Sequence, residues 1–268
     1  MAENGHQVIY TTHSHKMIDI FDTKGLVRLE YNETNKQTEI KYNNRSQDFN
    51  AESNSELLDE IIDFNNYIKI IEPNLNKIIF SKKIILVEGP NDLMVYKELI
   101  RKKAFKKHHD ERYANTYLNF NNIAIIPHHG KATAHILIEL CKHIGLDYYV
   151  INDFDFPEDF TSELHFDSEA DLKASELYNE EIALKECKNL KGEELSETTK
   201  KAMLTTNWKL IAKADIDKIH FNIPKLEGVM GYQLNDKNSL GIWNVVKSIE
   251  NIDEKLFPLS LSKFLELE

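Results

Sequence analysis

The stretch "ILVEGPND", residues 85–92, decides the fold of this chain. Three apolar residues run into Glu88, a Gly-Pro pair interrupts the chain, and a helical pattern begins near Asp92. A short, continuously apolar run is typical of a parallel strand that is buried on both faces. Glu88 therefore stands at the carboxyl end of a predicted strand, where α/β proteins gather their functional groups.

Two further apolar runs repeat this arrangement. The sequences "NIAIIPHHG" (122–130) and "DYYVINDFDF" (147–156) predict strands, and helical patterns separate them from each other and from the first strand. The alternation predicts an α/β fold, with a mostly parallel sheet flanked by helices. Residues 160–218 are polar and predict a helical insertion, after which "KIHFNIPKLEGVM" (218–230) predicts a strand, a loop and a helix.

The N-terminal region has a different pattern. Residues 6–14, "HQVIYTTHS", predict a strand that is followed by a short helix over Lys16–Phe21. The alternating runs "LVRLEY" (26–31) and "TEIKY" (38–42) predict a β-hairpin. The apolar spacing after residue 56 predicts a helix that ends near Pro73.

Composition limits the class of protein. With 268 residues and 41% apolar content, the chain is long enough to bury a core as one large or two small domains. It has no apolar run of membrane-spanning length, no signal-peptide pattern, and two cysteines in unrelated contexts. We therefore expect a cytoplasmic protein without a membrane partner, a disulfide framework or a zinc site.

The distribution of charge leaves one segment with two possible roles. The net charge of −11 argues against general nucleic-acid binding, but residues 97–112 are locally basic. This run is either a solvated helix face or a strip that follows the DNA backbone. In the second reading the DNA-binding residues are Lys102, Lys103, Lys106 and Lys107, joined by Lys131 after the Gly130 turn.

The acidic residues follow the predicted strand ends. If the strands are neighbours, Glu88, Asp92, Asp153 and Asp155 converge on one edge of the sheet. Clustered carboxylates repel one another unless a cation lies among them, and Mg²⁺ or Mn²⁺ prefers oxygen ligands. Each residue also has an ordinary alternative role, such as Asp92 at a helix N-terminus or Asp153 and Asp155 in a turn.

"ILVEGPND" followed by "VINDFDF" resembles the Toprim domain of topoisomerases, DnaG-type primases and certain nucleases. "QVIYTTHS", "FSKKIILVEGPND" and "IPKLEGV" further resemble the OLD (overcoming lysogenization defect) family, in which an ABC-type ATPase precedes a Toprim nuclease. The resemblance implies an ATPase-derived remnant over 1–50, a helical linker over 51–80 and a Toprim nuclease domain over 81–268. It places this chain as the C-terminal part of a longer protein or as a short relative.

The same resemblance implies roles for individual residues. Lys225 and Glu88 would be catalytic, and His13 would occupy the switch position of the ATPase. The spacer after Lys225 is shorter than in the family pattern, and Gly228 follows the acidic residue. The implied metal ligands are Glu88, Asp92, Asp153, Asp155 and Glu227.

The activity implied by the resemblance is metal-dependent DNA cleavage with two Mg²⁺ or Mn²⁺ ions. The chain contains no G-x-x-x-x-G-K-[ST] loop, so ATP would bind only in a full-length parent that includes the ATPase portion. The family also implies a homo-oligomer. Gabija-type relatives add a role in phage defence and a helicase partner.

Other functional classes stay open. The acidic cluster could belong to a Mg²⁺-binding regulatory or DNA-binding module that is inactive without its ATPase part. A topoisomerase would need a tyrosine nucleophile on a separate domain, and a primase would bring a zinc module that two cysteines do not support. A receiver-like α/β domain would not explain "QVIYTTHS".

Overall fold

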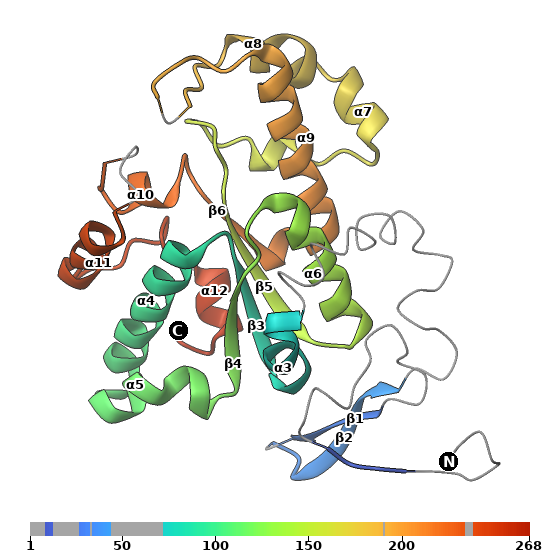
Figure 1. Ribbon diagram of the computed structural model, residues 1–268, viewed down its shortest axis with the longest axis vertical. Coiled ribbons are helices and arrows are strands. Elements are labelled where there is room, and N and C mark those ends of the chain that lie inside the picture. Colours follow the sequence, from blue (N-terminus) through green and yellow to red (C-terminus); the bar gives the residue numbers. More distant parts are fainter. Residues whose placement is uncertain (1–8, 13–26, 33, 44–71, 190, 234–237) are drawn as a thin grey trace.

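Four parallel strands form the centre of the protein in the computed structural model, which describes residues 9–12, 27–32, 34–43, 72–189, 191–233 and 238–268. The order across the sheet is β4-β3-β5-β6, and each neighbouring pair is parallel (Figure 1). The predicted α/β fold with a parallel sheet is confirmed. The strands are β3 (Lys83–Val87), β4 (Ile123–Pro127), β5 (Asp147–Asp153) and β6 (Ile219–Asn222).

The central strand β3 buries side chains on both faces of the sheet. Ile84 and Leu86 pack into one hydrophobic core, whereas Ile85 and Val87 pack into a second core on the opposite face. All four side chains are fully buried, and burial of each contributes about 1.5–3 kcal/mol. Two covered faces explain why the strand sequence is continuously apolar rather than alternating.

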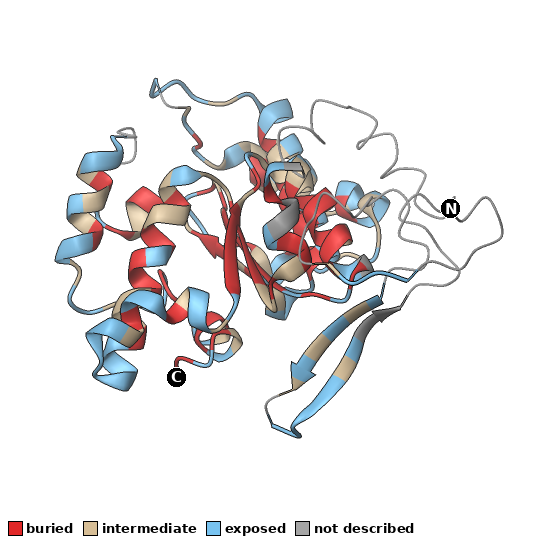
Figure 2. Ribbon diagram, turned by 60° about the horizontal axis from the view of Figure 1, so that its bottom comes forward, coloured by how far each residue is buried: buried red, intermediate tan, exposed pale blue. Residues whose placement is uncertain are grey.

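Helices cover the sheet on both sides. The first core receives α3 (Glu72–Phe80), α6 (Lys131–His143) and α9 (Glu197–Ala214). The second core receives α4 (Pro90–His108), α5 (Glu111–Phe120), α11 (Ser239–Ser248) and α12 (Leu259–Phe264). Figure 2 shows the buried strands between these two layers. No helix within the described ranges is long and apolar enough to cross a membrane.

The predicted helical insertion lies between β5 and β6. Its inner apolar residues Leu172, Leu177 and Ile182 belong to the same core as α6, so the insertion packs against the sheet layer. Its long helix α9 runs beside α6 (Figure 1). The other elements of the insertion are η5 (Thr161–Glu163), α7 (Glu169–Ala174), the π-helical turn η6 (Leu177–Glu181), α8 (Ile182–Leu184) and η7 (Ile216–Lys218).

The predicted hairpin is confirmed as antiparallel β1 (Val27–Asn32) and β2 (Gln37–Asn43). It is attached to the main body through Arg28, whose guanidinium donates to the carbonyl of Ser81 at 2.6 Å and to that of Gly145 at 3.4 Å. The opposite side of the hairpin exposes apolar residues, including Leu29 and Ile40. Its attachment is therefore polar rather than hydrophobic.

Two helices differ from the sequence prediction. A helix was expected to end near Pro73, but α3 (Glu72–Phe80) continues past Pro73. The helix α5 is not predicted by the sequence; Asp110 begins it by accepting a hydrogen bond from the Tyr113 N–H group at 2.9 Å.

The N-terminal strand prediction is only partly testable. Its described residues, Ile9 to Thr12, have no regular secondary structure, and Ile9 and Tyr10 are exposed. The predicted strand is therefore not formed over these four residues. The remainder of that strand, the helix over 16–21 and the helix before residue 72 lie outside the described residues.

A buried histidine orders the turn between β4 and α6. His128 Nε2 lies 3.0 Å from Asn152 Oδ1, and Nδ1 lies 2.8 Å from the carbonyl oxygen and 3.2 Å from the nitrogen of Gly130. Burial lowers the pKa of His128 to about 4, so the ring is neutral at pH 7. Gly130 has φ 141°, a conformation that residues with a side chain rarely adopt.

We expect the stability contributed by His128 to fall in acid. Between pH 6.5 and about 4 the unfolded chain binds a proton at this residue and the folded chain does not. Relative to His128→Gln, wild-type protein should therefore lose up to about 1.4 kcal/mol of unfolding free energy per pH unit in this window. Urea denaturation at several pH values measures the unfolding free energies of the two proteins. If the two free energies changed with pH in the same way, the prediction would be contradicted.

Candidate active site at the carboxyl edge of the sheet

The sheet order brings two predicted acidic motifs together. Glu88 directly follows β3 and Asp153 ends β5, and these strands are hydrogen-bonded neighbours. Glu88 Oε2 accepts from the Asn152 side-chain amide and from the Asp153 N–H group, both at 3.2 Å. The Glu88 carboxylate thus lies over the end of the neighbouring strand.

Asp92 lies in the first turn of α4. Its Oδ2 accepts from the Gly89 N–H group at 3.1 Å, which fixes the side chain at the start of the helix. The residue is only 9% exposed, and its Oδ1 is buried without a hydrogen-bond partner. Burial raises the pKa of Asp92 to about 7, with further contributions from Glu88 and Glu227.

Asp153 is held by a backbone group in the loop that follows β6. Its Oδ1 accepts from the N–H group of Leu226 at 2.8 Å, at the start of α10 (Leu226–Val229). Burial, followed by the charges of Glu88 and Asp92, raises its pKa well above the ordinary value for an aspartate. Glu88, Asp92 and Asp153 are therefore brought together, as expected from the sequence.

Asp155 has a different environment from Asp153. Its Oδ2 lies 2.5 Å from Lys131 Nζ, and its Oδ1 lies 3.2 Å from Lys225 Nζ. The backbone at Asp155 is left-handed, with φ 70°, which turns this side chain toward the lysines. The structure therefore places two predicted functional lysines on one carboxylate, and Lys131, expected to contact DNA, is engaged in an ion pair.

Glu227 and Lys225 also reach the site. Glu227 is 6% exposed in the first turn of α10, close enough to contribute to the raised pKa of Asp92. The Lys225 ammonium, although partly desolvated, has a raised pKa because Asp155 and, more weakly, Asp153 and Glu88 are near. The short spacer after Lys225 does not remove either residue from the site.

Two further residues of the site were missed by the sequence analysis. Asn222 ends β6 and is fully buried; its Oδ1 accepts from the Tyr96 hydroxyl at 2.9 Å, while its Nδ2 has no partner. Tyr96 lies one helical turn after Asp92 on α4. Two sequence features could have identified these residues. Asn222 is an amide at the end of the fourth strand, and Tyr96 follows the acidic Asp92 at i, i+4 spacing.

The donor set has the chemistry of a hard-cation site. Carboxylate oxygens are the ligands that Mg²⁺ and Mn²⁺ prefer, and Asp92 offers a buried oxygen that no protein group satisfies. Within the described ranges, however, no group of three or more histidine, cysteine, aspartate or glutamate side chains forms a ready metal site. The chemistry of these side chains therefore suits a divalent cation, but the side chains are not already arranged as a coordination sphere.

Most of the predicted basic strip is engaged in contacts within the fold. Lys102 Nζ donates to the carbonyls of Val246, Lys247 and Ile249 at 2.6–2.8 Å, where α11 ends. The other three lysines of the strip behave differently. Lys103 lies over the Phe257 ring, Lys107 donates to the Glu266 carbonyl and Lys106 is exposed.

The basic strip is also remote from the acidic residues. Lys106 is at the far end of α4 from Asp92, about 20 Å away along the helix. Lys102 therefore stabilises the fold, and only the outer lysines are free to meet a ligand. His13, the expected switch residue, lies outside the described residues.

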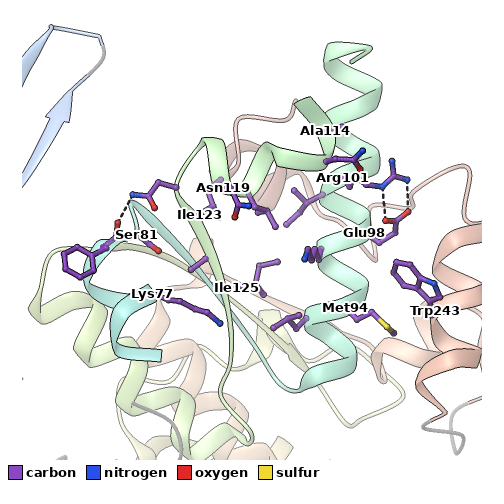
Figure 3. Close-up of a pocket in the computed structure, with 18 residues that line it drawn as sticks. Lys77, Ser81, Met94, Glu98, Arg101, Ala114, Asn119, Ile123, Ile125 and Trp243 are labelled. Atoms are coloured by element: carbon purple, nitrogen blue, oxygen red, sulfur yellow. Dashed lines mark hydrogen bonds and ion pairs between the residues drawn. The ribbon is translucent and has the colours of Figure 1, made fainter. Parts of the chain in front are cut away.

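One cavity is separate from the acidic residues. It has a volume of about 840 Å³ and lies between α4, α5 and the edge strand β4, with Trp243 at one side (Figure 3). Two of its charged residues, Glu98 and Arg101, are paired with each other at 2.8 Å. None of the predicted metal ligands lines it, so this cavity is not the site of the proposed chemistry.

A family model identifies part of the chain. Residues 79–155 match the family described as "Overcoming lysogenization defect protein-like, TOPRIM domain". The matched segment contains Glu88, Asp92, Asp153 and Asp155, and it ends before Lys225 and Glu227. No curated protein matches the chain.

We expect removal of one site charge to stabilise the metal-free protein. Asp92→Asn keeps an acceptor for the Gly89 N–H group but abolishes repulsion with Glu88 and Glu227. In EDTA at pH 8 it should raise the unfolding free energy by roughly 1–4 kcal/mol. Mg²⁺ at 100 times its dissociation constant should stabilise wild-type protein by about 2.7 kcal/mol, and the variant by less.

Asp110→Asn is the matched control for this experiment. It changes another aspartate that accepts a hydrogen bond at the start of a helix, but one that is exposed and far from the acidic residues. Chemical denaturation with and without Mg²⁺ gives the comparison. Equal Mg²⁺ stabilisation of wild type and Asp92→Asn would exclude Asp92 as a ligand.

We expect Lys102→Met to destabilise the protein, because it leaves three carbonyls at the end of α11 without their shared donor. The expected loss is roughly 1–3 kcal/mol of unfolding free energy. Lys106→Met, on the exposed side of the same helix, should leave stability unchanged. Equal stability of the two variants would show that Lys102 does not support this helix end.

Proposed function

We propose that this chain, whose residues 79–155 form an OLD-like Toprim domain, is the nuclease part of a metal-dependent DNA endonuclease. The Toprim match supports a metal-dependent nuclease role in general. The observation that carries the finer proposal is the convergence of Glu88, Asp92 and Asp153 with an unsatisfied buried carboxylate oxygen at the centre. No lysine or arginine is hydrogen-bonded to these three carboxylates within the described ranges.

The proposed metal ligands divide into two groups. Glu88, Asp92 and Asp153, with Glu227 beside them, would hold Mg²⁺ or Mn²⁺, and we propose two ions. Such ions, when bound, activate a water molecule and stabilise the leaving oxygen in phosphodiester hydrolysis. Asp155 would bind metal only by releasing an ammonium group, so we propose that its first role is to hold Lys131 and Lys225 at the site.

The protein's own residues supply orientation and positive charge. The Glu88 carboxylate is aimed by the Asn152 amide, which is itself oriented by His128. Lys225, partly exposed beside the acidic residues, would stabilise negative charge that develops on the phosphate. A compact ammonium is suited to this task because it acts as a point charge.

A DNA path is proposed from the site toward the far end of α4. The exposed residue Lys106 lies on the same side of this helix as Asp92 and would meet a phosphate group. The separation of about 20 Å between Asp92 and Lys106 corresponds to about six base pairs of duplex. Local contacts of this kind would allow an acidic chain to bind DNA.

The wider biological setting is proposed from family resemblance alone. It includes an ABC-type ATPase portion, which would supply ATP binding, and self-association of the protein. It also includes a role in phage defence, with a helicase partner if the system is of the Gabija type.

A second candidate function is supported by one observation. Because the metal ligands are not preassembled and Asp155 is held by two lysines, the chain resembles a Toprim module that needs another part to become active. In that case it would bind Mg²⁺ or DNA without cleaving DNA by itself.

We expect purified protein to nick or linearise supercoiled plasmid with Mg²⁺ or Mn²⁺, and not with EDTA. Glu88→Gln and Asp153→Asn should each lower the rate by at least about 100-fold, since each removes a charged ligand while preserving side-chain size. Glu254→Gln, on the exposed surface, is the control and should act as wild type. Agarose-gel time courses measure the rates.

The outcomes separate the two candidates. Full activity of either site variant would exclude this site. Absence of cleavage by folded protein that still binds Mn²⁺ in calorimetry would favour the regulatory or DNA-binding module.

A further inference from the structure

One residue of the helical insertion enters the candidate active site. Asn207 lies on α9 and is fully buried. Its Oδ1 accepts from Lys131 Nζ at 2.9 Å, and its Nδ2 donates to the Phe154 carbonyl at 2.7 Å. The same amide therefore contacts the lysine after the β4 turn and the backbone between the two aspartates of the D-F-D segment.

The Phe154 carbonyl belongs to a strained loop. The next residue, Asp155, has φ 70°, in the left-handed region that residues with a side chain adopt infrequently. The N–H groups of Phe154 and Asp155 donate to the carbonyls of Asn222 and Pro224, each at 2.9 Å. Two residues of the insertion bind the carbonyls of the same segment: Asn207 donates to that of Phe154, and the Cys187 thiol donates to that of Asp155 at 3.0 Å.

The position of the Lys131 ammonium depends on the same amide. Its side chain is 11% exposed and its Nζ lies between Asp155 Oδ2, at 2.5 Å, and Asn207 Oδ1. Only a side chain with both a donor and an acceptor satisfies Lys131 and the Phe154 carbonyl together. Aspartate would keep the acceptor alone, and leucine would keep neither.

We propose that Asn207 is a positioning residue, which holds the Lys131 ammonium against Asp155 and supports the D-F-D loop from the insertion side. This inference rests on the proposed nuclease function and extends it. The helical insertion is then part of the catalytic apparatus rather than a decoration of the fold. Asn207 acts through Lys131 and Asp155, and it touches neither DNA nor metal.

The test compares two substitutions at adjacent positions of α9. Asn207→Leu removes both hydrogen bonds at nearly constant volume. Trp208→Phe is the matched control: it removes one hydrogen bond from the next residue, to the Phe166 carbonyl at 3.1 Å. For each protein we would measure the unfolding midpoint, kcat and KM for plasmid nicking with Mn²⁺, and the rate of Lys131 acetylation by mass spectrometry.

We expect Asn207→Leu to lower kcat by about 10–100-fold with little change in KM. Lys131 should be acetylated faster than in wild-type protein, because its ammonium is no longer held. Trp208→Phe should lower stability without changing kcat or Lys131 acetylation. The two changes should be less than additive: Asn207→Leu should lower kcat less in the Lys131→Met background than in wild-type protein, because both remove the Lys131–Asn207 hydrogen bond and only Asn207→Leu removes the bond to the Phe154 carbonyl.

The inference is overturned if folded Asn207→Leu retains wild-type kcat and wild-type Lys131 acetylation, or if its effects equal those of Trp208→Phe. If Asn207→Leu does not fold, Asn207→Asp replaces it. That variant should keep Lys131 protected yet lower kcat, and wild-type kcat would overturn the inference. If wild-type protein does not nick DNA, the proposed function fails. The difference in Lys131 acetylation between Asn207→Leu and wild-type protein still tests the role of Asn207 in that case.

Discussion

Repulsion among buried carboxylates is the constraint on which the rest of the site depends. Burial and then the charge of Glu88 raise the pKa values of Asp92 and Asp153, and within the described ranges no basic side chain is hydrogen-bonded to the three carboxylates. Backbone N–H groups hold them instead, those of Gly89, Asp153 and Leu226. Each of these donors comes from a different strand end, so the arrangement exists only while β3, β5 and β6 keep their order. The fold therefore holds these carboxylates together in spite of their mutual repulsion, which a bound cation would reduce.

The positive charges of the site are gathered at one place. Lys131 and Lys225 both bind Asp155, which leaves the other three carboxylates free of ammonium groups. This separation creates an acidic pole suited to divalent cations and, beside it, a basic pole suited to a phosphate group. Two poles of opposite charge would suit the metal-dependent phosphodiester hydrolysis that we propose. The helical insertion takes part in the arrangement, because Asn207 holds both Lys131 and the loop that joins Asp153 to Asp155.

Much of the fold was predictable because the strands are buried on both faces. Continuous apolar runs such as Ile84–Val87 identify such strands from composition alone, and the intervening helical periodicity then implies parallel pairing. Helix boundaries were less predictable. The start of α5 depends on one capping residue, Asp110, and α3 continues past Pro73 rather than ending there. Local signals of this kind are compatible with more than one outcome until tertiary packing selects among them.

For the site, the sequence by itself determined which acidic residues stand at strand ends, whereas the strand order decided that Glu88, Asp92 and Asp153 meet. The tertiary structure alone decided what each residue contacts. It placed Asp155 beside two lysines and Lys102 at the end of a helix. It also brought Asn207, Asn222 and Tyr96 into the site from distant parts of the chain. The physical reason is that strand-end position follows from local hydrophobic pattern, whereas partner choice depends on how helices from separate segments pack over the sheet.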